Sequence, residues 1–194
     1  MTLASGRTRL LVVGGASGTG KTSVALELSA LLRRERIAHA LVDGDNLDAS
    51  YPAPGDVDRE WFSAVNLGKI WETYRAAGQH RLVYVNTVSV LETGALAAVV
   101  GTGTDTEVEV VAVLLSADPS SVHERLRGRE RGSELAVHLE RSDARRAELE
   151  ERAPAWVTRV DTTGRTIGEV AAEVLAITGW RAARGDASDP DAWV

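Results

Sequence analysis

Residues 15–22 of this 194-residue chain read Gly-Ala-Ser-Gly-Thr-Gly-Lys-Thr, which matches the pattern G-x-x-x-x-G-K-[ST] in full. The segment follows a continuous apolar run at 10–13 and precedes residues 22–36, whose apolar side chains recur with the period of a helix. A strand, a glycine-rich turn and a helix in this order can direct main-chain N–H groups at phosphate oxygens. A chance glycine-rich turn need not lie between two such elements, so we predict a phosphate-binding loop for a nucleotide.

Each residue type in this segment has a physical role in nucleotide binding. Glycines let the main chain turn so that successive N–H groups point inward. Lys21 supplies a cation for the β- and γ-phosphates, and the Thr22 hydroxyl can ligate Mg²⁺. Lysine occurs only at positions 21 and 69 among 22 basic residues, so its use at position 21 needs a reason. ATP and Mg²⁺ are the implied cofactors, and the predicted nucleotide-binding residues are Gly15, Ala16, Ser17, Gly18, Thr19, Gly20, Lys21 and Thr22.

Short apolar segments alternate with helical patterns along the rest of the chain. We predict strands at 10–13, 37–42, 82–85, 108–115 and 157–160. We predict helices at 22–36, 59–77, 90–100, 119–127, 134–152 and 167–177, the fourth of them capped by Asp118 and begun by Pro119. Residues 51–58 hold two prolines and a glycine and predict a loop. This alternation indicates an α/β fold with a parallel sheet and right-handed crossovers.

Composition restricts the class of protein. With 44% hydrophobic and 26% charged residues, the chain is typical of a soluble globular domain, which we place at 1–180, before a tail at 181–194 that we expect to be disordered. The absence of cysteine excludes disulfides and thiolate metal sites. We find no signal peptide and no apolar run long enough to span a membrane, so we expect a cytoplasmic protein. A net charge of −6 argues against nucleic acid as the partner.

Polar residues follow the second and third predicted strands. Asp43 and Asp45 lie at the sheet edge where open α/β folds bind ligands. Two carboxylates there can orient Mg²⁺, or accept a proton from a hydroxyl that attacks the γ-phosphate. A turn capped by Asp side chains would use the same residues, but the nearby phosphate loop favours the functional interpretation. Asn86 and Thr87 end the third strand, where they either face the substrate or only terminate the strand.

Two segments after the phosphate loop carry a family resemblance. Residues 41–47, Leu-Val-Asp-Gly-Asp-Asn-Leu, are similar to the D-G-D-N-[VI] segment of adenylylsulfate kinases. Residues 45–47 with two nearby prolines, and residues 56–61, Asp-Val-Asp-Arg-Glu-Trp, are similar to the D-x-L and D-D-x-R-x-x-W segments of gluconate kinases. The chain therefore resembles the small P-loop kinases, which include these enzymes and chloramphenicol phosphotransferase. The resemblance implies a three-layer P-loop NTPase fold, with a five-stranded parallel sheet of order 2-3-1-4-5.

The resemblance also implies roles for individual residues. Asp45 matches the carboxylate that acts as general base or substrate ligand, and Asp43 the supporting carboxylate, which we assign to Mg²⁺ with Thr22. We expect an acceptor cavity between Asp45, Arg59 and the lid, with Asn86 facing it.

The chain departs from the family pattern in two places. The third strand ends without the Asp of a Walker B motif, so the ligands of Mg²⁺ have to come from elsewhere. Asp48 stands where gluconate kinases have a histidine after D-x-L, which argues against gluconate as the acceptor.

Residues 125–131 read Arg-Leu-Arg-Gly-Arg-Glu-Arg and follow the fourth strand and its helix. Small P-loop kinases begin their lid at this point, with arginines that close over the phosphates. We predict a short Arg-rich lid at about 125–140, with Arg125 and Arg129 on one helix face. Because glutamates interleave with the arginines, a solvated helix with ion pairs is the alternative.

The sequence thus predicts an ATP-dependent phosphotransferase that moves the γ-phosphoryl group to a hydroxyl of a small molecule. The predicted catalytic residues are Lys21, Asp45, Arg125 and Arg129. Two alternatives remain at this stage. One is a nucleotide-binding regulatory or partner-binding protein with weak or no phosphotransfer, which the missing Walker B Asp keeps open. The other is end-phosphorylation of a nucleic acid, which the acidic net charge disfavours.

Overall fold

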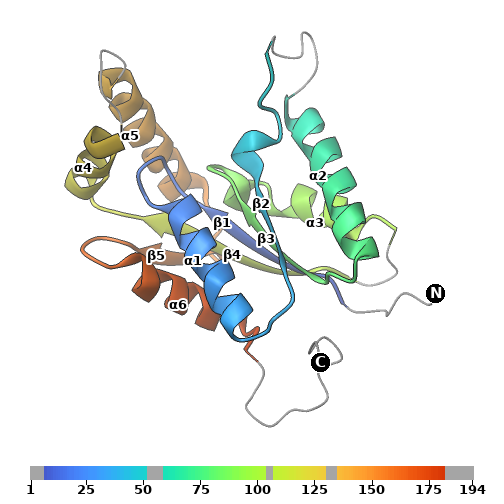
Figure 1. Cartoon of the computed structure of the whole chain (residues 1–194). Helices are drawn as coiled ribbons and strands as arrows, with labels where there is room; N and C mark the ends of the chain where they lie inside the picture. The colour runs from blue at the N-terminus through green and yellow to red at the C-terminus, as the bar shows by residue number, and fades with distance from the viewer. Residues whose placement is uncertain (1–6, 52–58, 104–106, 130–134, 182–194) are drawn as a thin grey trace.

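The structure is a computed structural model of the chain, and it describes residues 7–51, 59–103, 107–129 and 135–181 (Figure 1). Within these ranges the strands form one sheet in which all neighbours are parallel. The strands are β1 (Arg9–Gly14), β2 (Ala40–Asp43), β3 (Arg81–Val85), β4 (Glu109–Ser116) and β5 (Thr158–Asp161). Their order is β2-β3-β1-β4-β5, which confirms the expected five-stranded parallel sheet and its order.

Helices cover both faces of this sheet (Figure 1). On one face lie α1 (Lys21–Arg34) and α6 (Ile167–Thr178). On the other lie α2 (Arg59–Ala76), α3 (Thr93–Gly101) and α5 (Leu135–Arg152). The remaining helix, α4 (Pro119–Arg129), packs on α5 through a separate apolar cluster. The arrangement confirms a three-layer α/β fold.

The first apolar run, residues 10–13, forms the central strand β1, which is buried on both of its faces. Leu10 and Val12 face the layer of α2, α3 and α5, whereas Leu11 and Val13 face α1 and α6. None of the four side chains has any exposed surface. A parallel strand buried on both faces consists of apolar residues without alternation, as residues 10–13 do.

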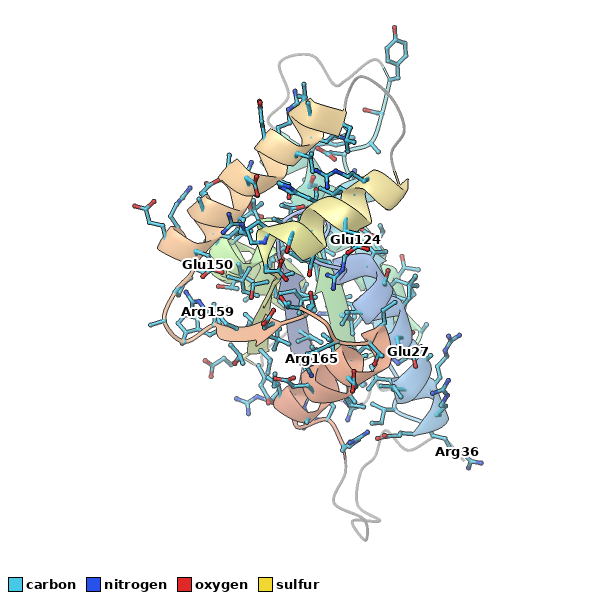
Figure 2. All side chains as sticks on the ribbon, turned by 90° about the vertical axis from the view of Figure 1, so that its left-hand side faces the viewer. Glu27, Arg36, Glu124, Glu150, Arg159 and Arg165 are labelled. Atoms are coloured by element: carbon cyan, nitrogen blue, oxygen red, sulfur yellow. The ribbon has the colours of Figure 1, made fainter. Side chains whose placement is uncertain are left out.

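The edge strand β5 is protected by charge. Arg159 lies beside Glu150 of α5, with 3.7 Å between guanidinium and carboxylate (Figure 2). Charged side chains on an edge strand oppose pairing with a second sheet. The sheet can therefore end at β5 without burying further apolar surface.

The second strand begins later than expected, at Ala40 instead of residue 37. The main chain leaves α1 through Arg36, whose φ is +58°, and the Ile37 N–H donates to the carbonyl of Leu32 over 2.9 Å. His39 then bonds the Ile37 carbonyl through Nδ1 and the Ser29 hydroxyl through Nε2. Residues 37–39 thus complete the helix end and cannot pair along their length with β3.

The helix expected at 90–100 is divided. A short 3-10 helix, η2 (Ser89–Leu91), precedes α3, which begins only at Thr93. The Ser89 hydroxyl donates to the Asn86 carbonyl, and the Asn86 side-chain oxygen accepts the Val88 N–H. These bonds wind the chain into turns directly after β3, and local side-chain bonds of this kind compete with an α-helix.

Several expectations fall on parts of the chain that the structure does not describe. They are the loop at 52–58, the central lid residues 130–134 and the tail at 182–194. Arg181, the last described residue, forms an ion pair with Glu35 at 2.8 Å. Among the described helices, none combines the length and the apolar composition that crossing a membrane requires.

Candidate active site

The predicted phosphate loop joins the carboxyl end of β1 to the start of α1. Gly20, directly before the helix, has no side chain to cap it, so the N–H groups of the first turn stay open to an anion. Lys21 is only 7% exposed, and its Nζ lies 3.4 Å from the Ala16 carbonyl oxygen. The ammonium is thus folded back over the loop, where it can reach phosphate oxygens.

Internal contacts fix the shape of this loop. The Thr19 hydroxyl donates to the Ala16 carbonyl over 2.8 Å, and the Gly15 N–H donates to the Thr87 carbonyl over 3.1 Å. Gly18 has a φ of +84°, and a Cβ there would lie 2.9 Å from a methyl group of Val122. Both the backbone angle and the close approach of α4 therefore require glycine at this position.

Arg125, a predicted lid residue, braces the loop from α4. Its guanidinium donates to the Gly18 carbonyl over 3.2 Å and to the Thr162 hydroxyl and carbonyl, each over 2.9 Å. The Thr162 hydroxyl in turn donates to the Thr19 carbonyl over 3.2 Å. These contacts connect α4, the phosphate loop and the segment after β5. They give Arg125 a positioning role, and its catalytic role stays a prediction.

Asp43 caps a turn, as the alternative interpretation of the sequence expects, and it also contacts Thr22 of the phosphate loop. One carboxylate oxygen accepts the Asp45 N–H over 3.1 Å and so caps the 3-10 helix η1 (Gly44–Asn46). The other accepts the Thr22 hydroxyl over 3.2 Å. The turn therefore holds the Asp43 carboxylate beside Thr22, the last residue of the phosphate loop.

This pair of oxygen donors fits magnesium. Mg²⁺ is usually held by one or two protein oxygen ligands together with water and the phosphates of a nucleotide. Within the described residues no group of three or more His, Cys, Asp or Glu side chains could hold a metal by itself. Thr22 and Asp43 are thus the residues that would hold a nucleotide-bound Mg²⁺.

Asp45 lies at the end of β2 beside the end of β3. The Asn86 side-chain amide donates to one Asp45 carboxylate oxygen over 2.9 Å, and the Thr87 N–H lies 3.5 Å from the same atom. The Val88 N–H fixes the other end of the Asn86 amide over 3.0 Å. The structure thus brings Asp45 and Asn86 together, and their place on the acceptor side of the site stays a prediction.

Tyr84 is a part of this site that the sequence analysis did not single out. Its ring packs on Gly44, where a Cβ would come within 2.2 Å of the Tyr84 hydroxyl oxygen. Burial raises the pKa of Tyr84 to about 12, and the negative charges of Glu92, Asp45, Asp43 and Asp48 add to this effect. The hydroxyl therefore stays protonated. In the sequence, Tyr84 lies within the apolar run of a strand, so only its hydroxyl group distinguishes it from a core residue.

Two cavities adjoin these residues. The larger, about 640 Å³, lies between Ser17 of the phosphate loop, Thr87 and α5. The smaller, about 250 Å³, is lined by Asp48, Tyr84, Asn86 and Glu92 and by apolar residues of α2 and α3. Both volumes are near or within the range of small-ligand pockets. The side chains of Arg59 and Arg129 lie outside the described part, so their places in the predicted site stay predictions.

The face of α5 toward the larger cavity was also missed by the sequence analysis. Arg141 lines this cavity, and the buried Ser142 donates its hydroxyl to the Ser17 carbonyl over 2.8 Å. The arginine-rich pattern continues into this helix, but pattern alone does not show which arginines face the phosphate loop. Which arginines face the phosphate loop depends on how α5 packs on the sheet.

Solved structures of small P-loop kinases have the same fold. A gluconokinase from Sinorhizobium meliloti is 20% identical, with a TM-score of 0.57 over 90% of this chain and 92% of its own. An APS kinase from Mycobacterium tuberculosis, solved with AMPPNP and APS, is 24% identical, with a TM-score of 0.54 over 89% and 98%. A tunicamycin resistance protein from Deinococcus radiodurans is 21% identical, with a TM-score of 0.57 over 89% and 96%.

The sequence comparison is more specific about the family. No curated protein matches the chain by sequence. Residues 10–152, most of the chain and all of the candidate site, match the family described as an AAA domain. The chain therefore belongs to this AAA domain family, and its fold is that of the small P-loop kinases.

Proposed function

We propose that this protein is an ATP-dependent kinase that phosphorylates a hydroxyl group of a small molecule. The observation that carries the proposal is the position of Asp45. Its carboxylate is held by Asn86 at 2.9 Å, and its main-chain N–H bonds Asp43, the residue that reaches Thr22 at the end of the phosphate loop. A proton acceptor and a nucleotide site thus meet at one edge of the sheet.

The arrangement suits an in-line phosphoryl transfer. The acceptor hydroxyl gives its proton to the Asp45 carboxylate as its oxygen bonds to the γ-phosphorus, and the bond from that phosphorus to the bridging oxygen breaks to release ADP. Lys21 and the first turn of α1 offset the phosphate charge, and Asn86 orients the base. Mg²⁺, when bound at Thr22 and Asp43, would neutralise the negative charge of the β- and γ-phosphate oxygens.

The acceptor class rests on the similar structures and on the second cavity. The gluconokinase, the APS kinase and a shikimate kinase that is 15% identical are named for small-molecule acceptors, which supports the same class here. Asp48 lines the smaller cavity beside Tyr84 and Asn86. A carboxylate at this place repels an anionic acceptor, so we expect an acceptor other than gluconate.

An acceptor screen with γ-labelled ATP tests the proposal. Wild-type protein with Mg²⁺ should release ADP above the rate without acceptor for at least one hydroxyl compound, and the label should appear on that compound. Lys21→Ala should abolish both signals, because its side chain faces the phosphates. If the wild type binds ATP but labels no acceptor across neutral, cationic and anionic alcohols, the regulatory alternative replaces the kinase proposal.

A further inference from the structure

We infer that the acceptor is a small amino alcohol, a molecule with a protonated amine, an apolar body and the hydroxyl that receives the phosphoryl group. The inference rests on the proposed function, since it names the acceptor of that same transfer. It is carried by the smaller cavity beside Asn86, through its place next to the proposed base, an unpaired hydroxyl in its wall and the charge of its lining.

The smaller cavity adjoins both halves of the proposed reaction. Asn86 lines it, and the Asn86 side-chain amide donates to the Asp45 carboxylate over 2.9 Å. Val88 lines it as well, whereas the intervening Thr87 lines the larger cavity beside Ser17 of the phosphate loop. An acceptor in the smaller cavity and a nucleotide at the phosphate loop would thus meet where Asp45 is held.

A hydroxyl group in the wall of this cavity lacks a partner. Tyr84 lines the cavity and is only 3% exposed. Within the described ranges, no residue forms a hydrogen bond with the Tyr84 hydroxyl. Burial raises the pKa of Tyr84 to about 12, so the hydroxyl keeps its proton at neutral pH. Because buried polar groups are normally hydrogen-bonded, we expect this hydroxyl to donate to an oxygen of a bound molecule.

The charged side chains that the structure describes in this cavity are all negative. Asp48, which follows η1, and Glu92, which precedes α3, line it from two separate elements. The Glu92 side chain does not cap α3. After the larger effect of burial, both carboxylates add to the raised pKa of Tyr84, so their charge reaches the wall of the cavity. Such a site attracts a cation and repels a carboxylate or a phosphate.

The lining suits an organic cation better than a metal ion. In the part of the chain that the structure describes, no group of three or more His, Cys, Asp or Glu side chains could hold a metal. Much of the wall is apolar, with Leu67 from α2 and Leu96 and Val99 from α3. A charge beside such a wall needs an opposite charge as partner. An ammonium group on an apolar body meets both conditions, and a volume of about 250 Å³ restricts the acceptor to a small molecule.

The charge also decides which group of the acceptor reacts. Nearby carboxylates favour the protonated form of an amine, and a protonated amine has no electron pair with which to attack phosphorus. The hydroxyl beside Asp45 keeps its electron pairs and gives its proton to the carboxylate. The products are therefore an amine with a phosphate ester, and ADP.

Matched alcohols of different charge test the inference with γ-labelled ATP and wild-type protein. The probes are leucinol and phenylalaninol as amino alcohols, their N-acetyl derivatives as neutral counterparts, and leucate and phenyllactate as anionic ones. We expect label on an amino alcohol, with a kcat/KM at least about tenfold above that of its N-acetyl derivative, the difference that one hydrogen bond to a charged group makes. We expect no label on the hydroxy acids.

Variants without the two charges show whether the cavity causes this preference. Asp48→Asn combined with Glu92→Gln should bring the amino alcohol and its N-acetyl derivative to within about twofold of each other and leave the ATP Kd within about twofold of wild type. A merely structural role would lower both transfers alike and keep the preference. Glu151→Gln is the matched control, because this exposed glutamate of α5 carries the same charge and does not line the cavity.

Tyr84→Phe tests the unpaired hydroxyl separately. The variant keeps the ring against Gly44 and removes only the hydroxyl. It should raise the KM of the amino alcohol and of its N-acetyl derivative by about 3- to 10-fold, the loss of one neutral hydrogen bond. An unchanged KM for both would show that the Tyr84 hydroxyl does not contact the acceptor, against the inference.

The outcomes separate this inference from the proposed function. Label on a neutral or anionic alcohol at a rate equal to or above that of the amino alcohol overturns the inference and leaves the kinase proposal standing. A preference for the amino alcohol that survives the loss of both carboxylates overturns it too. Wild-type protein that binds ATP but labels no alcohol of any charge overturns the proposed function and this inference together.

Discussion

The Thr22 hydroxyl donates to the Asp43 carboxylate over 3.2 Å, which joins the end of the phosphate loop to the end of β2. The two residues lie 21 positions apart and belong to different elements, so the bond depends on the parallel sheet that brings the carboxyl ends of β1 and β2 to one edge. The same carboxylate caps η1 through the Asp45 N–H. One side chain thus connects the proposed metal-binding position to the proposed general base.

Asp43→Asn should therefore raise the Mg²⁺ concentration needed for half-maximal turnover by about tenfold or more, because the amide is a poorer ligand for a hard cation. It should still cap η1, since an amide oxygen accepts the same N–H. Excess Mg²⁺ should restore part of the rate. An unchanged Mg²⁺ dependence in a titration of turnover would exclude Asp43 from the metal site.

Arg125→Ala removes three hydrogen bonds that brace the phosphate loop. We expect the free energy of unfolding to fall by about 1–3 kcal/mol and the Kd for ADP to rise, because the Gly18 and Thr162 carbonyls lose their partner. Thermal unfolding and ADP titration measure the two effects, with Arg127→Ala as the control. A loss of turnover with unchanged stability and ADP affinity would instead support the lid role of Arg125.

Gly44→Ala tests the contact between η1 and β3. A methyl group would meet the Tyr84 hydroxyl at 2.2 Å and two ring carbons at 2.5 and 2.9 Å, so either the Tyr84 ring or the main chain that carries Asp43 and Asp45 has to shift. Turnover should fall at least tenfold, because small displacements of a catalytic group are costly. Gly168→Ala on α6, where a Cβ meets nothing within 4 Å, should leave turnover unchanged. Equal activity of the two variants would show that the Gly44–Tyr84 contact has no role.

The half-buried His39 predicts a pH effect on stability. Burial lowers its pKa below the ordinary value, and the charges of Arg33 and Arg81 lower it further, against the opposing effect of the Ile37 carbonyl. The unfolded chain then binds a proton more readily than the folded one, so stability is full above about pH 6.5 and is lost as the pH falls through the folded pKa.

Urea unfolding of wild type and His39→Gln at pH 7.5 and pH 5.5 measures this effect. On acidification the wild type should lose more free energy of unfolding than the variant, since the other ionisable groups are common to both. If the wild type and the variant lose the same free energy of unfolding, the prediction is wrong.

Much of the fold could be predicted because its signals are local. The run at 10–13 is apolar because β1 is covered on both faces, and Asp118 with Pro119 places the start of α4 correctly. The strand order came from the family resemblance and not from any pattern in the residues. The boundary errors arose where side chains bond the main chain locally, at His39 and at Asn86, which hydropathy patterns do not detect.

The candidate site could be predicted where its residues lie close together in the sequence. The phosphate loop and Asp43 with Asp45 lie within 31 residues of sequence, 15–45, and one motif and one strand end mark them. Tyr84, Arg141 and Ser142 depend on contacts across the sheet edge, such as the 2.8 Å bond from Ser142 to Ser17. Arg125 was noted for its charge, but its contacts with Gly18 and Thr162 could be known only from the packing of α4.

The most direct test of the account compares wild type and Asp45→Asn with γ-labelled ATP and an acceptor from the screen. The substitution keeps the size of the side chain and an oxygen for the Asn86 amide, but removes the proton acceptor. We predict an ATP Kd within about twofold of wild type and a rate of label transfer that is about 10²- to 10⁴-fold lower, as for a lost general base. Label transfer at the wild-type rate would contradict the central claim.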